Sequence, residues 1–211
     1  MPLQLLAQNP FYFVAWVAAI LTALTVHEFS HAVMSTALGD ETAKRGGRLS
    51  LNPIAHIDPV GFIALLLVGF GWGRPVPFNP YNLRYPKWGS AFVAAAGPLS
   101  NFISVIVFGS IFAVLNGVLA PGNLLLTFLE LLVGLNVVLG IFNLIPIPPL
   151  DGSKFLLSAL SSPKYYGIRQ TLETRGPFIL LIVIIADNFL GINILSGIFQ
   201  KALEFTMRVF S

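Results

Sequence analysis

Long stretches with almost no charge alternate with charged or Gly/Pro-rich segments along the 211-residue chain. The first covers about residues 11–38 and carries Glu28 as its only fixed charge. Further apolar stretches cover about residues 88–119, 124–144 and 177–199. Because a helix of about 20 mostly apolar residues crosses a bilayer, the pattern predicts about four transmembrane helices.

The connection between the first two spans, residues 39–87, is rich in Gly and Pro. It contains an apolar run, Val60–Phe70, that is too short to span and is expected to be re-entrant or interfacial. The stretch 46–51 is compatible with a short β-hairpin. These features predict an all-α polytopic membrane protein with an irregular loop region. We expect one domain over residues 1–211, with its core at about 10–160.

The composition agrees with a membrane-embedded chain and narrows its chemistry. The chain is 55% hydrophobic and 10% charged, whereas soluble domains contain about 25% charged residues. Cysteine is absent, which excludes disulfides and thiolate metal ligands. The net charge of +3 suits anionic lipid headgroups, so the lipid bilayer, and no nucleic acid, is the expected partner.

Basic residues set the expected orientation of the first span. No Lys or Arg precedes it, whereas Lys44, Arg45 and Arg48 follow it closely. The positive-inside rule then places its C-terminal end toward the cytoplasm and the N-terminus outside. The expected location is the cell (plasma) membrane, with any site at that end facing the cytoplasmic side.

The polar residues of the first span form one local pattern, His27-Glu28-Phe29-Ser30-His31. On a helix, His27 and His31 lie one turn apart on the same face, so both imidazoles can bind one metal ion. A glutamate between them can act on metal-bound water, as in zinc-dependent peptidases. Ionisable residues inside a span are costly and usually functional. A chance match, or a polar patch against a neighbouring helix, is therefore the weaker interpretation.

Catalytic zinc usually has three protein ligands, and the local pattern supplies only two. The candidates for the third are His56, Asp58, Glu130, Asp151 and Asp187. Asp151 is favoured because it follows the proline-broken segment 146–149 and enters from the same side as His31. Its alternative role is to cap a helix that starts near Ser153. Glu130 lies mid-span, where a hydrogen bond to a neighbouring helix is the alternative.

These residues predict hydrolysis with one zinc ion per chain. Zinc lowers the pKa of bound water to about 7 and polarises a peptide carbonyl, and Glu28 is the expected general base. Asn143 is a candidate donor to the oxyanion, with helix capping or an interhelical hydrogen bond as the alternative. Asn52 and His56, in the loop 52–59, are candidate substrate contacts. Turn formation and an exposed loop histidine would explain these two residues without function.

With these residues in view, the sequence resembles the site-2 protease family of intramembrane zinc metalloproteases. The matching motifs are His27–His31, Asn52-Pro53 with His56 and Asp58-Pro59, Ala96–Asn101, and Asn143–Pro146 leading to Leu150-Asp151-Gly152. The resemblance covers about residues 10–160. It implies zinc ligation by His27, His31 and Asp151, with Glu28 as the base. It also implies a single-pass transmembrane protein as substrate, cut within or near the bilayer.

The chain also departs from some members of that family. It has no room for the PDZ-like or CBS domains that some members carry, and the span that precedes the motif helix in several relatives is missing. We therefore expect a minimal member of the family.

Two other functions fit parts of the sequence. A metal- or proton-coupled transporter would explain the broken segment 146–149 together with Glu130 and Asp187. It would not explain a glutamate between two histidines four residues apart. A non-catalytic helix-binding relative would have no need of Glu28. Intramembrane proteolysis by a zinc metalloendopeptidase is the predicted function.

Overall fold

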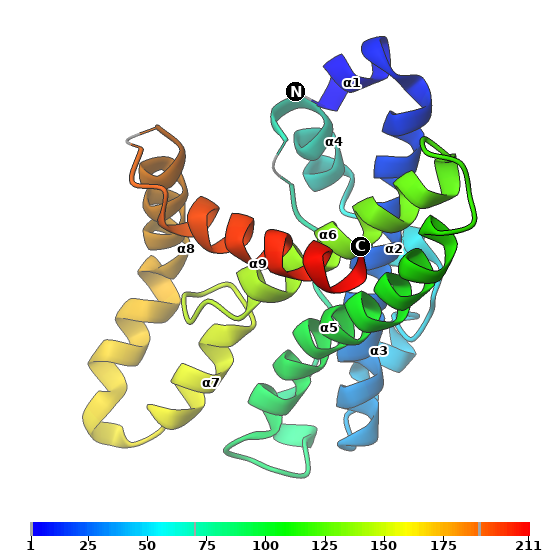
Figure 1. Cartoon of the computed structure of the whole chain (residues 1–211). Helices are drawn as coiled ribbons and strands as arrows, with labels where there is room; N and C mark the ends of the chain where they lie inside the picture. Colours follow the sequence, from blue (N-terminus) through cyan, green and yellow to red (C-terminus); the bar gives the residue numbers. More distant parts are fainter. Residues whose placement is uncertain (1, 70, 190) are drawn as a thin grey trace.

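The computed structural model describes residues 2–69, 71–189 and 191–211, and its elements are helical (Figure 1). The α-helices are α1 (Pro2–Gln8), α2 (Pro10–Ala37), α3 (Thr42–Arg45), α4 (Pro59–Val68), α5 (Gly89–Asn116), α6 (Leu124–Asn143), α7 (Gly152–Ala159), α8 (Tyr166–Phe189) and α9 (Ile194–Phe210). Short 3₁₀ helices are η1 (Pro53–Ala55), η2 (Pro80–Asn82) and η3 (Pro163–Tyr165).

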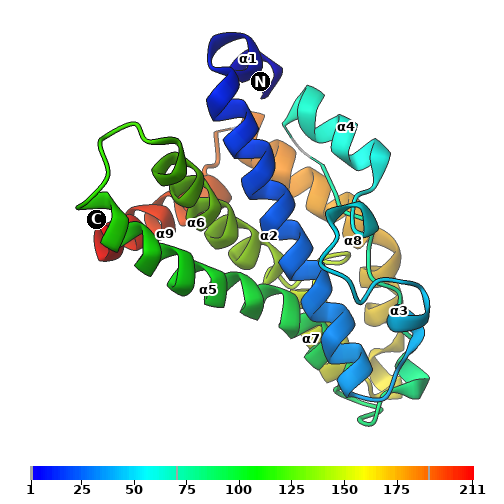
Figure 2. The ribbon, with the colours of Figure 1, turned by 90° about the vertical axis from the view of Figure 1, so that its right-hand side faces the viewer.

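The helices α2, α5 and α6 form the centre of the molecule, where each packs against the other two (Figures 1 and 2). All three are long and apolar enough to cross a membrane, and each begins and ends within a few residues of a predicted span. Small side chains allow the close packing, since Ala19 and Ala23 of α2 are buried against Leu132 of α6. Three of the predicted spans are thus confirmed as continuous apolar helices.

The fourth predicted span, 177–199, does not form one continuous helix. The helix α8 ends at Phe189 and α9 begins at Ile194, while Gly191 and Asn193 between them have φ angles of 67° and 54°. This left-handed backbone conformation ends a helix. The chain then turns, and α9 packs against α6 and α5. The prediction of a single span here is corrected to two helices joined by a turn.

The long connection 39–87 is irregular, as predicted, but its described residues form no β-hairpin. None of residues 46–51 is in a strand, and in the described part of the chain the one isolated β-bridge joins Ile57 to Gly73. The helix α4 confirms a short apolar helix at the predicted run, whose last residue, Phe70, lies outside the described residues. Its re-entrant placement stays a prediction.

Side-chain contacts take the place of strand pairing in this loop. His56 is fully buried, and its Nε2 donates to the Ser50 carbonyl at 2.7 Å. The buried Arg48 guanidinium donates to the carbonyl of Arg74. Side chains therefore satisfy backbone acceptors of this connection without strand pairing.

Candidate metal centre

Three side-chain atoms meet between α2 and the start of α7. His27 Nε2 lies 3.1 Å from His31 Nε2, and Asp151 Oδ2 lies 3.1 Å from the first and 3.2 Å from the second. Ligand atoms bound tetrahedrally at about 2.0–2.1 Å from zinc are about 3.3 Å apart. The triangle therefore has the dimensions of a zinc site, and it joins the three residues that the sequence favoured.

The second ring nitrogen of each histidine indicates where its proton lies. His27 Nδ1 is 2.6 Å from Asn101 Oδ1, and His31 Nδ1 is 2.8 Å from the Val93 carbonyl oxygen. Both oxygens accept hydrogen bonds, so each Nδ1 donates and each Nε2 of a neutral ring presents a lone pair. Asp151 Oδ2 is buried with no hydrogen bond in the described part of the chain. Two Nε2 lone pairs and a carboxylate oxygen repel one another at this distance unless a cation lies between them. The donor set of two imidazoles and one carboxylate is therefore suited to a zinc ion.

Two buried amides support His27 from α5 and α6. Asn101 Nδ2 donates to Asn136 Oδ1 at 2.8 Å, and Asn136 Nδ2 donates to the Leu132 carbonyl at 2.7 Å. Both asparagines are fully buried. The chain of bonds turns Asn101 so that its oxygen faces His27. Outer partners of this kind orient the histidines that bind a metal.

The helix α5 passes the two imidazoles at very short range, and Gly97 makes this possible. A Cβ at this position would lie 2.5 Å from Cε1 and Nε2 of His31 and 2.6 Å from Cε1 of His27. Real side chains do not approach so closely, so the backbone of α5 can come this near only at glycine. The small residues of the Ala96–Asn101 motif thus serve the metal centre directly.

Asp151 reaches the histidines because the chain turns sharply between α6 and α7. Three prolines within 146–149 prevent the helix from continuing past Asn143. Gly152 then packs against the Leu144 carbonyl, where any side chain would collide. Asp151 Oδ2 faces the Nε2 atoms of both histidines, and a carboxyl group binds a metal in its ionised form.

Glu28 is partly buried on α2, and its Oε2 accepts a hydrogen bond from the Val76 N–H at 3.2 Å. His31 and Arg48 lie within electrostatic range of its carboxylate. Burial lowers the pKa of Arg48, while the Glu28 carboxylate acts to raise it and the Arg74 cation acts to lower it. The expected base thus lies in a charged environment built from α2 and the long connection.

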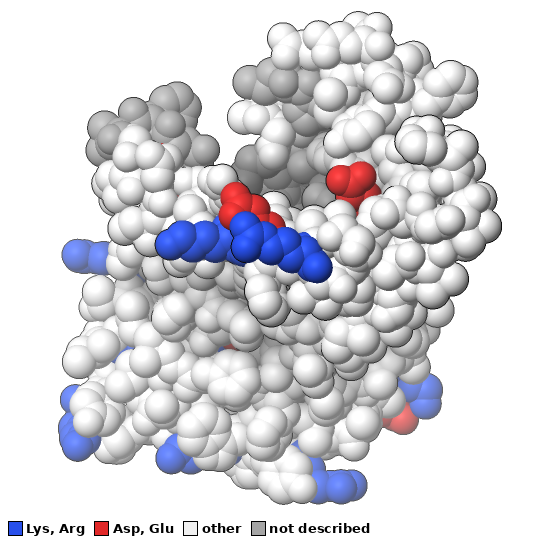
Figure 3. All heavy atoms as spheres, viewed as in Figure 1, with Lys and Arg blue, Asp and Glu red and all other residues white. Residues whose placement is uncertain are grey.

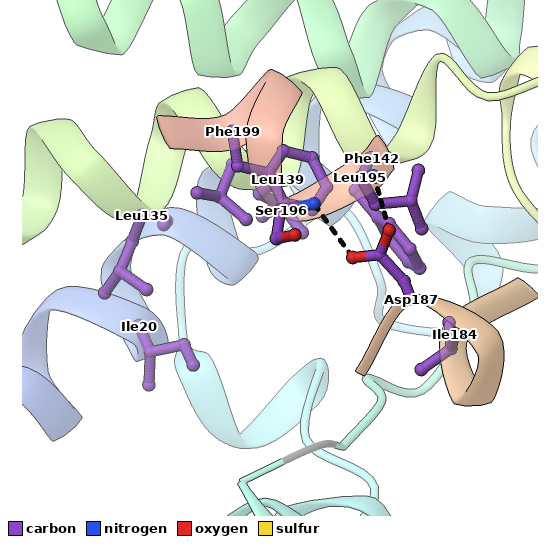
Figure 4. Close-up of a pocket in the computed structure, with 11 residues that line it drawn as sticks. Ile20, Leu135, Leu139, Phe142, Ile184, Asp187, Leu195, Ser196 and Phe199 are labelled. Carbon is purple, nitrogen blue, oxygen red and sulfur yellow. Dashed lines mark hydrogen bonds between the residues drawn. The ribbon is translucent and has the colours of Figure 1, made fainter. Parts of the chain in front are cut away.

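The other carboxylate candidates lie outside this cluster. Asp58 Oδ1 accepts a hydrogen bond from the Gly61 N–H at 2.8 Å and caps α4. Asp187 lies beside an apolar cavity, where its oxygens accept backbone hydrogen bonds from α9 (Figure 4). Glu130 is exposed on α6. Their hydrogen bonds and exposure account for these three residues without a metal.

The predicted oxyanion donor and substrate contacts have local partners. Asn143 Nδ2 donates to the Leu139 carbonyl at 3.0 Å. Asn52 is exposed, and its Oδ1 accepts from the Ile54 N–H at 3.1 Å. Both ring nitrogens of His56 face the loop interior. The interpretation of His56 as an exposed loop histidine is wrong, because the ring is fully buried.

Asn136, Asn101 and Arg48 also surround the site, although no sequence pattern assigned any of them a role in it. A signal for Asn136 was present, because a polar amide inside an apolar run usually marks a hydrogen bond between helices. No local signal could have shown that Asn101 faces His27, since the two residues are 74 positions apart and on different helices.

The chain is similar to proteins named as zinc metalloproteases. The model of peptidase family M50 matches residues 118–184. The "Putative zinc metalloprotease YwhC" of Bacillus subtilis is 33% identical over 200 residues, which cover 92% of this chain and 90% of that protein. The "Putative zinc metalloprotease Rip2" of Mycolicibacterium smegmatis is 31% identical over 150 residues, which cover 66% of this chain and 55% of Rip2. No solved structure matches the chain.

Proposed function

The chain belongs to peptidase family M50, the site-2 protease family of zinc metalloproteases, and from this premise we propose that it cleaves membrane proteins within the bilayer. The bond cut would lie within or near the transmembrane helix of a single-pass substrate. The observation that carries the proposal is the triangle of His27, His31 and Asp151, because two of its corners lie on an apolar helix long enough to span.

The three ligands and Glu28 divide the chemistry between them. His27, His31 and Asp151 would hold zinc, which when bound lowers the pKa of its water ligand to about 7 and polarises the substrate carbonyl. Glu28 takes the proton of the attacking water and passes it to the leaving amine. Its Oε2 is held by the Val76 N–H, and its Oε1 makes no hydrogen bond with the described residues. That oxygen is therefore available for the proton.

Asn143 is the proposed donor to the oxyanion. One N–H of its amide is bound to the Leu139 carbonyl, and the second N–H remains to donate to the carbonyl oxygen of the scissile bond. The residue lies on the last turn of α6, eight positions before Asp151. Asn52 is proposed as a substrate contact, with its side chain exposed on the loop that the buried His56 supports.

The proposed topology follows from the charges. Basic residues after α2 favour a cytoplasmic position for the active site and an outside position for the N-terminus, in the plasma membrane. Non-helical backbone at membrane depth must line protein or water. The segments 39–87 and 145–153 are therefore proposed to line a polar cavity that brings water to the zinc from the cytoplasm.

The test is cleavage of a transmembrane peptide in liposomes that contain the purified full chain. The probe is a fluorogenic peptide with about 20 apolar residues and a Gly-Pro pair near its centre. Glu28→Gln is expected to lower the rate by about 10²–10⁴-fold while zinc stays bound. Glu41→Gln makes the same chemical change on an exposed residue and should leave the rate unchanged.

Two results would contradict the proposal. One is cleavage that persists in Glu28→Gln, and the other is cleavage by the wild type that a zinc chelator does not reduce. Cleavage of soluble unfolded peptides with no preference for the membrane peptide would leave a metalloprotease but remove the intramembrane assignment.

A further inference from the structure

A cavity of about 600 Å³ lies between the start of α5, α7 and the first turn of α8, away from the ligand triangle. The loop before α5 closes one side of it. Its polar lining includes Tyr81, Lys87, Ser90, Lys154, Ser158, Ser161 and the Arg169–Glu173 pair. Nothing in the proposed proteolysis uses these residues.

The cavity carries excess positive charge. Lys87, Lys154 and Arg169 line it, and the one carboxylate among its lining residues, Glu173, accepts a hydrogen bond from Arg169 Nε at 3.1 Å. Lys87 makes a cation–π contact with Trp88, 5.3 Å from Nζ to the ring centre, which does not neutralise its charge. Two cations therefore have no carboxylate partner among the lining residues, and the cavity favours an anion.

The hydroxyl groups indicate which kind of anion. Ser90, Ser158 and Ser161 contribute three donors to the lining, and their side chains make no hydrogen bond within the described part of the chain. A phosphate group has three or more acceptor oxygens and binds cations and hydroxyl donors together. A carboxylate has only two oxygens and would leave part of this donor set unused.

The position of the cavity indicates the source of the phosphate. In Figure 3, separate Lys and Arg side chains lie along the lower end of the molecule, and a further basic band crosses its middle. The cavity lies at this end, where α5 begins. Trp88 and the almost fully exposed Tyr81 also lie here, and aromatic residues of this kind collect at the membrane–water interface. The cavity is therefore at headgroup depth.

We propose that this cavity binds the phosphate group of an anionic ligand, with an anionic phospholipid headgroup as the source that its depth favours. The inference is independent of the proposed proteolysis. Binding would join α5, α7 and α8 at one point. The helix α7 directly follows Asp151, whose backbone carbonyl accepts the Lys154 N–H at 2.9 Å. An occupied cavity would therefore hold the segment that presents the third zinc ligand.

The experiment measures lipid binding to the full, delipidated chain in detergent by native mass spectrometry. The probes are phosphatidylglycerol, phosphatidylcholine and inorganic phosphate. The double variant Lys87→Gln/Lys154→Gln should bind phosphatidylglycerol about 25-fold more weakly, at about fivefold for each cation. Lys44→Gln/Arg45→Gln removes the same charge from exposed residues of α3, outside the cavity. Because these two residues do not line the cavity and salt screens charges that are not in contact with the ligand, this control should change binding by less than about twofold.

Each outcome decides part of the proposal. Equal loss of affinity in the two double variants would overturn the cavity as the binding site, because the lipid would then be attracted by the overall positive charge of the protein. Phosphatidylcholine bound as tightly as phosphatidylglycerol would overturn the anionic ligand. Inorganic phosphate bound as tightly as the lipid, with the same dependence on Lys87 and Lys154, would support the phosphate site and overturn the lipid as its source. Equal zinc content and melting temperature in all variants show that the fold is intact.

Discussion

Asp151 directly precedes α7, and Asp187 lies in the last turn of α8 with α9 following it; the sequence offers both as metal ligands. Asp187 accepts hydrogen bonds from the N–H groups of Leu195 at 2.8 Å and Ser196 at 2.9 Å, so both its oxygens are engaged at the start of α9 (Figure 4). Asp151 occupies the N-cap position of α7 but makes no side-chain capping bond. Its Oδ2 faces His27 and His31 instead.

The difference lies in where the first backbone N–H groups of each helix find acceptors. In the turn before α7, the N–H groups of Ser153 and Lys154 donate to backbone carbonyls at 3.0 and 2.9 Å. That turn satisfies the helix start by itself and leaves the Asp151 carboxylate free. Among the described residues no such turn precedes α9, and its Leu195 and Ser196 N–H groups donate to the Asp187 carboxylate instead. An aspartate before a helix is thus available to a metal when the backbone has already capped the helix.

The largest effect is expected when each of the two carboxylates is removed in turn. Asp151→Ala should lower bound zinc from about one ion per chain to nearly none, because two histidines alone do not hold catalytic zinc. Asp187→Ala should leave the zinc content unchanged. Elemental analysis of protein purified without chelator measures both. Zinc retained in Asp151→Ala, or lost in Asp187→Ala, would reverse the roles assigned to the two residues.

A smaller loss of zinc is expected when the support of His27 is removed. Asn101→Leu should weaken zinc binding about 10–100-fold, since outer-shell partners have effects of this size. A competing zinc indicator measures the affinity. Asn116→Leu, at the exposed end of the same helix, is the matched control and should bind zinc normally. Equal affinities in the two variants would show that His27 needs no amide partner.

The capping role of Asp187 predicts a modest effect on stability alone. Asp187→Ala should destabilise the fold by about 0.5–2 kcal/mol, the usual loss for a helix cap. Thermal unfolding in detergent measures the change. Glu204→Ala, on the exposed face of α9, removes the same charge without a cap and should shift the melting temperature less. An unchanged melting temperature in Asp187→Ala would contradict the capping role.

The smallest effect at neutral pH concerns Asp40, a buried carboxylate surrounded by donors as Asp187 is. Burial acts to raise the pKa of Asp40, but hydrogen bonds from the Thr42 hydroxyl, the Asn82 amide and the Asn79 N–H outweigh it and lower the pKa. The stability gained from these bonds is complete above the unfolded pKa of about 3.9. It is lost as the pH falls through the lower folded value.

Unfolding of the wild type and of Asp40→Asn across pH 2–7 tests this dependence. The wild type should lose stability below about pH 4. The variant should be less stable at pH 7 and should lose less on acidification. Parallel curves for the two proteins would rule out Asp40 as a source of acid sensitivity.

Several features followed from the sequence because their causes are local. The spacing of His27 and His31 places both imidazoles on one helix face whatever surrounds it. The three main apolar runs form α2, α5 and α6. An uninterrupted run of about 20 mostly apolar residues is enough to predict a helix that can span a membrane. The prolines at 146–149 end a helix in any fold. The choice of Asp151 agreed with the structure because its position beside that break is also local.

Contacts between distant segments account for what the sequence did not predict. The division of the fourth span arises where Asp187 binds the backbone of α9. The loop 46–51 is held by His56 and Arg48 rather than by strand pairing. The support of His27 by Asn101 depends on how α5 packs beside α2. The sequence thus contains the candidate metal-binding pair and the local turn that frees Asp151, whereas packing between helices brings Asp151 to the pair and orients the imidazoles. The physical reason is that a hydrogen bond or a close approach between distant residues depends on where whole helices lie, which no local pattern of residues specifies.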